Sequence, residues 1–438
     1  MKNLTQIATA LLILLFIGTT FAQQEKGIIG EENWLYNWTE FKPSSIDYSE
    51  PTQILRGTIK EDTKLLKKHI YLLSGNVFVA DSTTLTIEPG TVILGDYETK
   101  ASLTIAKTAR IIADGLETDP IVFTSNRARK KEGDWGGLII LGDAPTNKFG
   151  NGSVASYYPR LDSGSYGATN YGGENKESNS GILRFVRVEY AGKRVDRDQY
   201  FNGLLLAGVG SKTILENIMV SYSAGNSFEV LGGNVKLTKA VSYKSASIDF
   251  KFNFGSQSTV TNSLVVRSPY SSSISGSRCM DIKSFDQRAE VDFNKPGTSV
   301  KAVNMTMINR TDDLAGSIEK GLIKEALYVG ENTFLDMNKT VISGFNPAVV
   351  FSGKIRVNQE SLDRIKFSEM YFNNCNGNIF IENYSNNEDL ENWYGNPSFF
   401  NVYSKGLDEE TFIDVFSEKR PDFRLRINKI IATNDITD

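Results

Sequence analysis

Residues 217–268 read NIMVSYSAGNSFEVLGGNVKLTKAVSYKSASIDFKFNFGSQSTVTNSLVVRS, and this stretch decides the fold. Its short runs of Val, Ile, Leu and Phe are separated by Gly, Asn, Ser and Lys. The triplets Val220-Ser-Tyr222 and Val241-Ser-Tyr243 begin 21 residues apart, and Phe228 and Phe250 lie 22 apart. Short strands that recur at a fixed period of roughly 20 residues are typical of a chain that winds one coil per repeat.

The pattern continues on both sides of this stretch. Leu85-Thr-Ile87 and Leu103-Thr-Ile105 repeat 18 residues apart, and Leu264-Val-Val266 begins another turn. Each coil would bury an inward row of apolar side chains, while its backbone pairs with neighbouring coils about 4.8 Å away. The predicted fold class is therefore all-β: a right-handed parallel β-helix, a pectate-lyase-like solenoid, with irregular N- and C-terminal caps.

Asparagines mark the corners that such coils require. We expect corners at Asn217, Asn226, Asn234 and Asn262. Asn tolerates left-handed backbone geometry better than most residues, and stacked Asn side chains can bond to one another. These residues are predicted to be structural.

The order of segments divides the chain into four parts. Residues 1–22 form a signal peptide, 23–69 an N-terminal cap segment, 70–385 the β-helix and 386–438 a C-terminal cap segment. Within the β-helix, residues 150–181 are rich in Gly, Ser, Tyr and Asn and lack the strand pattern. We expect this segment to be an excursion over the surface.

The N-terminus predicts export from the cytoplasm. Lys2 precedes an apolar run from Ala8 to Ile17, and the small residues Thr20 and Ala22 fit a cleavage site after Ala22. The run is about half the length needed to span a bilayer, so no transmembrane segment is predicted. A net charge of −4 without a basic block argues against a nucleic-acid partner.

The positions of the two cysteines and the single histidine do not indicate a metal site or a catalytic site. Cys279 and Cys375 are too few for a disulfide framework or a zinc motif, and they form either two buried free thiols or one bridge. The single histidine, His69, precedes the first predicted coil, so it is expected at the surface or in a cap.

Three motifs resemble a family of exported β-helix proteins common in Bacteroidetes. They are GDWGGLIILG at residues 133–142, PIVFTS at 120–125 and LRFVRVEYAG at 183–192. The resemblance implies a cell-envelope or surface protein of no assigned activity, often encoded beside TonB-dependent outer-membrane receptors. It supplies no active site.

In that family an acidic cluster follows the Val-x-Tyr strand, and the resemblance implies a calcium site there. The matching run here keeps Asp249 and Asn253, with Lys251 between them, and a second match keeps Asp281. Calcium takes about six to eight oxygen ligands. The prediction is therefore no cofactor, with calcium at Asp249, Asn253 and Asp281 as the alternative.

Catalysis is weighed because parallel β-helices carry many polysaccharide lyases and hydrolases, although a fold does not imply a function. A lyase would need a Lys or Arg base, and Lys251, Arg267 and Asp249 lie on adjacent predicted coils. Motifs for serine hydrolases, nucleotide sites and zinc sites are missing from the sequence. No catalytic residues are predicted.

Aromatic residues at both ends of the chain are candidate contacts with a sugar or a protein. The candidates are Trp34, Tyr36, Trp38, Trp393 and Tyr394, with capping as the alternative for the last two. Asp81-Ser82-Thr83 resembles an O-glycosylation site of Bacteroidetes envelope proteins, with Ser82 as the acceptor.

Together these observations predict a non-catalytic exported protein that docks onto another envelope protein, with an outer-membrane β-barrel receptor as the candidate partner. The alternative is an adhesin or glycan-binding module, and the third choice is a polysaccharide lyase or hydrolase that uses Lys251 or Arg267. The expected location is the periplasm, or the outer membrane or cell surface through a partner.

Overall fold

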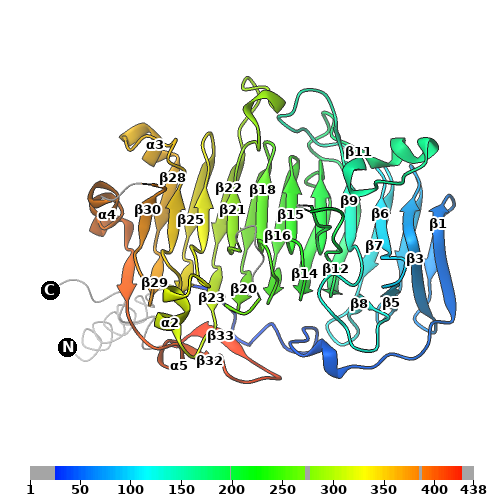
Figure 1. Cartoon of the computed structure of the whole chain (residues 1–438), viewed down its shortest axis with the longest axis horizontal. Helices are drawn as coiled ribbons and strands as arrows, with labels where there is room; N and C mark the ends of the chain where they lie inside the picture. Colours follow the sequence, from blue (N-terminus) through cyan, green and yellow to red (C-terminus); the bar gives the residue numbers. More distant parts are fainter. Residues whose placement is uncertain (1–24, 198, 272–276, 384–386, 427–438) are drawn as a thin grey trace, which may run out of the picture.

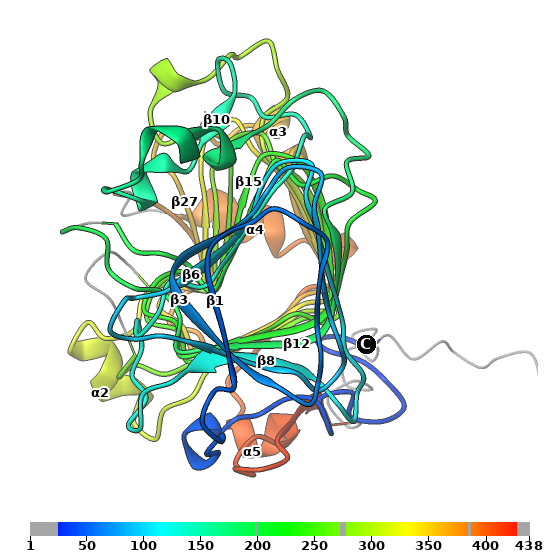
Figure 2. The ribbon, with the colours of Figure 1, turned by 90° about the vertical axis from the view of Figure 1, so that its right-hand side faces the viewer.

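The computed structural model describes residues 25–197, 199–271, 277–383 and 387–426 (Figure 1). The predicted signal peptide, residues 1–22, lies outside them. Most strands join one parallel sheet that winds around a single core. The prediction of a right-handed parallel β-helix is confirmed. Figure 2, which looks along the axis, shows three walls around the interior.

Each coil crosses three faces in the same order. The first face holds β2 (Thr63–Leu65), β4 (Thr84–Ile87), β7 (Arg110–Asp114), β12 (Gly181–Glu189), β14 (Ile214–Ser221), β16 (Asn234–Thr238), β19 (Gln257–Thr261), β22 (Ser299–Val303), β25 (Phe334–Asn338) and β28 (Ile365–Ser368). The second face holds β5 (Val92–Gly95), β8 (Ile121–Ser125), β17 (Val241–Tyr243), β20 (Leu264–Arg267), β23 (Thr306–Asn309), β26 (Val341–Ser343), β29 (Tyr371–Asn373) and β31 (Val402–Ser404), together with the second halves of β12 and β14.

The third face carries the site described below. It holds β6 (Ser102–Ile105), β9 (Leu138–Leu141), β13 (Leu204–Ala207), β15 (Phe228–Leu231), β18 (Phe250–Asn253), β21 (Met280–Ile282), β24 (Leu327–Val329), β27 (Val349–Phe351) and β30 (Ile379–Ile381). Strands β1 (Gln53–Ile59) and β3 (Ile70–Val79) bend from the second face onto the third.

The core consists of identical positions stacked from coil to coil. Phe228 of β15 lies over Phe250 of β18, with ring centroids 4.8 Å apart and planes 5° from parallel. Met280 and Leu327 continue the column in the next coils. All four side chains are fully buried, and this stacking is why the sequence repeats apolar residues at a fixed spacing.

The corner between the first and second faces needs one residue with a left-handed backbone in most coils. Asn217 has φ 51° and Asn262 has φ 50°, as the sequence predicted. Asn226 and Asn234 are not at such corners, because Asn226 lies beside the third face and Asn234 begins β16. In the coil of β16 and β17 the corner residue is Lys239, with φ 52°. Tertiary structure therefore enforces the left-handed conformation on a residue that seldom adopts it.

The N-terminal segment does not cap the end of the solenoid. Residues 25–48, here called the strap, run along the second face in the direction opposite to the coils, and include the 3₁₀ turn η1 (Pro43–Ser45) (Figure 1). Gly27 bonds to Lys339, Ile28 to Thr306 and Ile29 to Asn262, so each step along the strap reaches an earlier coil.

The strap shares an apolar cluster with the second face. Its members include Ile28, Leu35, Trp38 and Phe41 of the strap, Val241, Leu264, Val266, Ile308 and Val341 of the face, and Phe412, Val415, Phe423 and Leu425 of the C-terminal hairpin. That hairpin pairs β32 (Phe412–Asp414) with β33 (Asp422–Leu425) and follows α5 (Asp408–Thr411). The coils themselves begin at Gln53, earlier than the expected Ile70, since β1 pairs with β3.

A short helix covers the C-terminal end of the solenoid. Helix α4 (Glu388–Tyr394) places Leu390 and Tyr394 on the core, and the Tyr394 hydroxyl donates to the carbonyl of Ile365 at 2.7 Å. The 3₁₀ turn η5 (Pro397–Phe399) follows. Two further short helices, α2 (Leu314–Glu319) and α3 (Gln359–Asp363), lie in loops.

The expected surface excursion lies on the outside of the third face. It contains β10 (Gly152–Ser153), η2 (Ala155–Tyr157), η3 (Ser163–Thr169) and β11 (Asn170–Tyr171), and β10 pairs with β11 (Figure 2). The loop after β21, with η4 (Arg288–Glu290), joins it through a bridge between Lys148 and Val291. Across the described residues, no helix combines the length and hydropathy needed to cross a membrane.

A candidate binding groove on the third face

One row of side chains points outward from the third face, one residue per strand. Their neighbours on each strand, such as Phe228 and Val230 around Glu229, lie in the core, so alternation turns the row toward the outside. From β3 to β30 the row reads Phe78, Thr104, Ile139, Leu205, Glu229, Lys251, Asp281, Tyr328, Val350 and Phe380. Charge is therefore confined to three consecutive strands in the middle of the row.

The part of the row before Glu229 is sealed by the excursion. Tyr158 and Tyr171 pack with Phe78, Ile139 and Leu205 in one apolar cluster, and all five are buried. The Tyr158 hydroxyl also forms a hydrogen bond with Thr104. This half of the face is therefore unavailable to a ligand.

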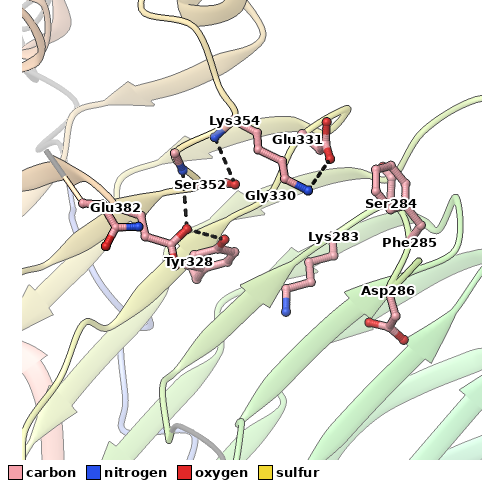
Figure 3. Close-up of a pocket in the computed structure, with 12 residues that line it drawn as sticks. Lys283, Ser284, Phe285, Asp286, Tyr328, Gly330, Glu331, Ser352, Lys354 and Glu382 are labelled. Atoms are coloured by element: carbon pink, nitrogen blue, oxygen red, sulfur yellow. Dashed lines mark hydrogen bonds and ion pairs between the residues drawn. The ribbon is translucent and has the colours of Figure 1, made fainter. Parts of the chain in front are cut away.

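A groove opens where the excursion ends. Its first part has a volume of about 530 Å³ and lies over Glu229, Lys251 and Asp281, between the excursion, the loop after β21 and the loop that carries Asn226. Its second part, of about 470 Å³, continues over Tyr328 to Lys354 and Glu382 (Figure 3). Lys283 and Asp286 line both parts, so the two parts adjoin at these residues.

Glu229 and Lys251 form an ion pair in the floor of the groove. Lys251 Nζ lies 2.8 Å from Glu229 Oε1, and Asn202 donates to Glu229 Oε2 at 2.6 Å, with Asn226 at 3.3 Å. Burial alone would lower the pKa of Lys251, but the carboxylates of Glu229 and Asp286 outweigh it and hold that pKa above its usual range. Lys251 therefore stays protonated at neutral pH.

Asp281 lies one strand further along. Its Oδ2 accepts a hydrogen bond from Arg278 Nη1 at 3.1 Å and lies 3.5 Å from Lys283 Nζ. Its Oδ1 is buried without a hydrogen-bond partner. Arg278 also reaches Glu325 at 2.6 Å. A buried carboxylate oxygen without a hydrogen-bond partner costs free energy.

The second part of the groove alternates donors and acceptors around one aromatic ring. Tyr328 donates to Glu382 at 3.2 Å, and Lys354 lies 3.4 Å from Glu331, as the dashed lines in Figure 3 show. Lys283 Nζ lies 5.4 Å from the centre of the Tyr328 ring. Burial raises the pKa of Tyr328, so its hydroxyl remains a donor at neutral pH.

The structure separates the three residues considered for a lyase. Asp249 and Arg267 form an ion pair at 2.5 Å inside the coil, where Ser242 also donates to Asp249. Lys251 points to the other side of the sheet, into the groove. The three side chains on these adjacent coils therefore do not all meet: Asp249 pairs with Arg267, but it lies at a corner immediately before β18, where strand alternation no longer applies, and it faces inward, away from Lys251.

The candidate calcium ligands are likewise not brought together. Asp249 is turned inside, Asn253 donates to Asp286 at 3.0 Å, and Asp281 is held by cations. Among the described residues, no group of three or more His, Cys, Asp or Glu side chains is arranged to hold a metal ion.

The aromatic candidates lie in different environments. Trp38 belongs to the strap, is fully buried against the second face and stacks on half-buried Trp34 at 6.2 Å between ring centroids, whereas Tyr36 is exposed. At the other end Tyr394 is buried in the cap, and half-buried Trp393 packs near Phe399. Trp38 and Tyr394 therefore serve packing, and neither reaches the groove.

Ser82 and the two cysteines are the remaining residues that the sequence singled out. Ser82 is exposed in a turn after β3, and its backbone N–H bonds to Thr108. Cys279 and Cys375 are buried free thiols, which confirms the first of the two alternatives for them. Burial raises the pKa of Cys375 to about 11, so that thiol is unreactive at neutral pH.

Sequence reasoning missed most of the groove. Glu229 could have been found, because it is the one charged residue in Phe228-Glu-Val-Leu231, where strict alternation turns it outward. Tyr157 ends the 3₁₀ turn η2, and Asn202 and Arg278 lie in loops. None of the three belongs to a periodic pattern, and no sequence signal places them beside Glu229.

The comparisons with known proteins agree with the architecture. A family model described as a pectate-lyase like beta helix domain matches residues 57–399. No significant match was found among curated proteins or among solved structures.

Proposed function

Because the chain belongs to the family of pectate-lyase-like β-helix domains, we propose that it is an exported binding protein whose groove on the third face holds an extended carbohydrate chain. One observation carries the proposal. The outward row is apolar at both ends and charged only at Glu229, Lys251 and Asp281, and this charged part forms the floor of the groove.

The dimensions of the groove suit a chain of several sugar rings. Successive strands lie about 4.8 Å apart, so the five steps from Glu229 to Phe380 span roughly 24 Å. The floor offers carboxylates, an ammonium group, amides and phenols, which can accept from and donate to sugar hydroxyls. Tyr328 is half-buried and leaves ring surface for a sugar to contact.

The side chains in the floor favour binding over cleavage. A lyase needs a neutral base, but Lys251 is held protonated by Glu229. Glu229 accepts from Lys251, Asn202 and Asn226, so its oxygens are engaged. Arg267, the other base considered, lies inside the coil. These residues therefore support a non-catalytic role.

The test is binding to a panel of four polysaccharides: polygalacturonate, xylan, mixed-linkage β-glucan and mannan. We expect the protein to bind at least one of them, and Lys251→Met to weaken that binding about tenfold, the effect of losing one charged hydrogen bond. Lys236→Ala, an exposed lysine on the first face, is the control. Unchanged binding by a folded Lys251→Met variant would contradict the groove as the site.

Docking onto another envelope protein is the second candidate. Phe400, Leu407 and Phe416 expose more than half of their surface, and all three lie in the C-terminal part of the chain. Exposed apolar side chains of this kind often mark protein contacts. Purification of the tagged protein from detergent-solubilised envelopes, compared with a Phe400→Ser/Phe416→Ser variant, tests this role: a partner retained only by the wild type would support it.

A further inference from the structure

We infer that the groove recognises the end of a carbohydrate chain and not an internal stretch, with the terminal sugar held at Glu229 and Lys251. This inference rests on the proposed function and adds the form of the ligand. It follows from an asymmetry along the third face, since the groove is closed on one side of the charged residues and open on the other.

The closed side is a packed wall. Leu205, the outward residue one strand before Glu229, is fully buried beneath the excursion. Tyr157 packs against the same apolar cluster. Its ring meets the ring of Phe201 edge-on, with 5.0 Å between the two ring centroids. A sugar chain that lay on Glu229 could therefore not continue over Leu205 without unpacking this cluster.

The wall ends in polar groups that face the ion pair. Tyr157 lines the groove, and its hydroxyl accepts a hydrogen bond from Asn202 Nδ2 at 3.4 Å. The same Asn202 amide donates to Glu229 at 2.6 Å. Gln199 and Ser156, bonded to each other at 3.0 Å, complete this side. The closed end thus offers hydroxyl, amide and carboxylate groups where a terminal sugar would present its extra hydroxyl.

The roof over the charged residues is fixed to the wall. Lys148 forms an ion pair with Glu290 at 3.0 Å, and Asn147 donates to the carbonyl of Ser284 at 2.9 Å. Asp292 bonds back to Asn147 at 2.8 Å. These contacts tie the segment that leads into the excursion to the loop after β21.

The other side has no such cover among the described residues. Tyr328, Val350 and Phe380 are half-exposed, and the groove continues past Lys283 to Lys354 and Glu382. Along the outward row, and within the described part of the chain, this is the direction in which a bound chain can leave the groove. The ion pair of Glu229 and Lys251 carries no net charge, so the terminal subsite best fits an uncharged sugar.

The experiment compares the four polysaccharides of the binding panel before and after partial acid hydrolysis, which increases the number of chain ends per gram. We expect the amount of protein bound at saturation per gram of polysaccharide to rise in proportion to the chain ends, measured by reducing-sugar titration. A capacity that stays constant or falls after hydrolysis would overturn the chain-end inference while leaving the proposed function intact. Lack of binding to all eight preparations would overturn both.

Variants of the wall give an independent test. Tyr157→Ala removes the ring and the hydroxyl at the closed end, so binding to the hydrolysed chains should weaken about tenfold. Tyr166→Ala, an exposed tyrosine of the same excursion outside the groove, is the matched control. Equal binding by both variants, each folded by circular dichroism, would contradict recognition at the closed end.

Discussion

Two ion pairs lie on opposite sides of the same sheet. The pair of Glu229 and Lys251 faces the groove, whereas that of Asp249 and Arg267 is enclosed in the coil. Arg267 also donates to the carbonyls of Ser245 and Ser247, so the guanidinium is fully engaged. Burial raises the pKa of Asp249 in spite of this arginine. The inner pair is therefore structural and fixes a corner of the coil.

Arg267→Met should lower the free energy of unfolding by about 3–5 kcal/mol, because it leaves a buried carboxylate without its partner. Adding Asp249→Asn should recover part of this loss. Arg184→Met, which breaks a surface pair with Asp114, should cost less than about 1 kcal/mol. Urea denaturation measures all three, and similar losses for Arg267→Met and Arg184→Met would contradict a structural role for the inner pair.

Among the described residues, no carboxylate forms an ion pair with the buried Lys193. Its ammonium group lies 3.2 Å from Asn76 Oδ1 and 4.3 Å from the centre of the Phe201 ring. Burial, together with the charge of Lys100, lowers its pKa from 10.5 to about 8. The folded protein therefore binds fewer protons than the unfolded chain between these two pH values.

The stability of the wild type relative to Lys193→Met should accordingly rise as pH increases from about 8 to 10.5, and should be independent of pH well below 8. Thermal unfolding across this range measures the difference. A difference that does not change with pH would contradict the lowered pKa.

At this scale the sequence predicted which strand residues are buried better than it predicted the site. Alternation placed Phe228 and Phe250 in the core and could equally have placed Glu229 and Lys251 outside. It failed for Asp249, which lies at a corner immediately before β18, where alternation no longer applies.

The strap is the element that departs most from the expected arrangement. An irregular aromatic segment was predicted to cap an end, but its side chains cover the second face along its length. The reason is the outward row of that face, which is apolar at Val241, Leu264, Ile308 and Val341 and must be shielded from water. A single sequence does not show which of several apolar surfaces such a segment will cover.

Trp38→Ala tests how tightly the strap is held. Trp38 is fully buried, its ring lies 6.0 Å from that of Phe185, and its indole donates to the carbonyl of Trp34 at 2.7 Å. The truncation should destabilise the protein by about 3–5 kcal/mol. Tyr36→Ala, two residues away and 37% exposed, should change stability by about 0.5 kcal/mol or less. Equal effects would show that the strap is not packed as described.

At the scale of the whole molecule, the two ends of the solenoid differ. Helix α4 covers the last coils, but none of the residues of β1 is buried, and within the described chain β1 pairs only with β3. The fold could be predicted from the repeat. The open end and the one-sided groove could not, because they depend on where the excursion and the strap come to lie.

Hydrogen–deuterium exchange should follow this difference. Amides of β1 that point away from β3 lack a strand partner and should exchange quickly, whereas those of β18 lie between β15 and β21 and should exchange slowest. Peptides that cover 53–59 and 250–253 allow the comparison by mass spectrometry. Equally slow exchange in both would mean that another chain covers β1, and dilution would then speed up the exchange of β1.

The path of the strap also sets an order of events during biosynthesis. Ile29 bonds to Asn262 across 233 residues, Ile28 to Thr306 across 278, and Asn33 to Pro421 across 388. The strap leaves the ribosome before any of these partners exists, so it cannot dock until the coils are wound. During that interval Val241, Leu264 and Ile308 face water, and the half-made protein is most exposed to aggregation and to chaperones.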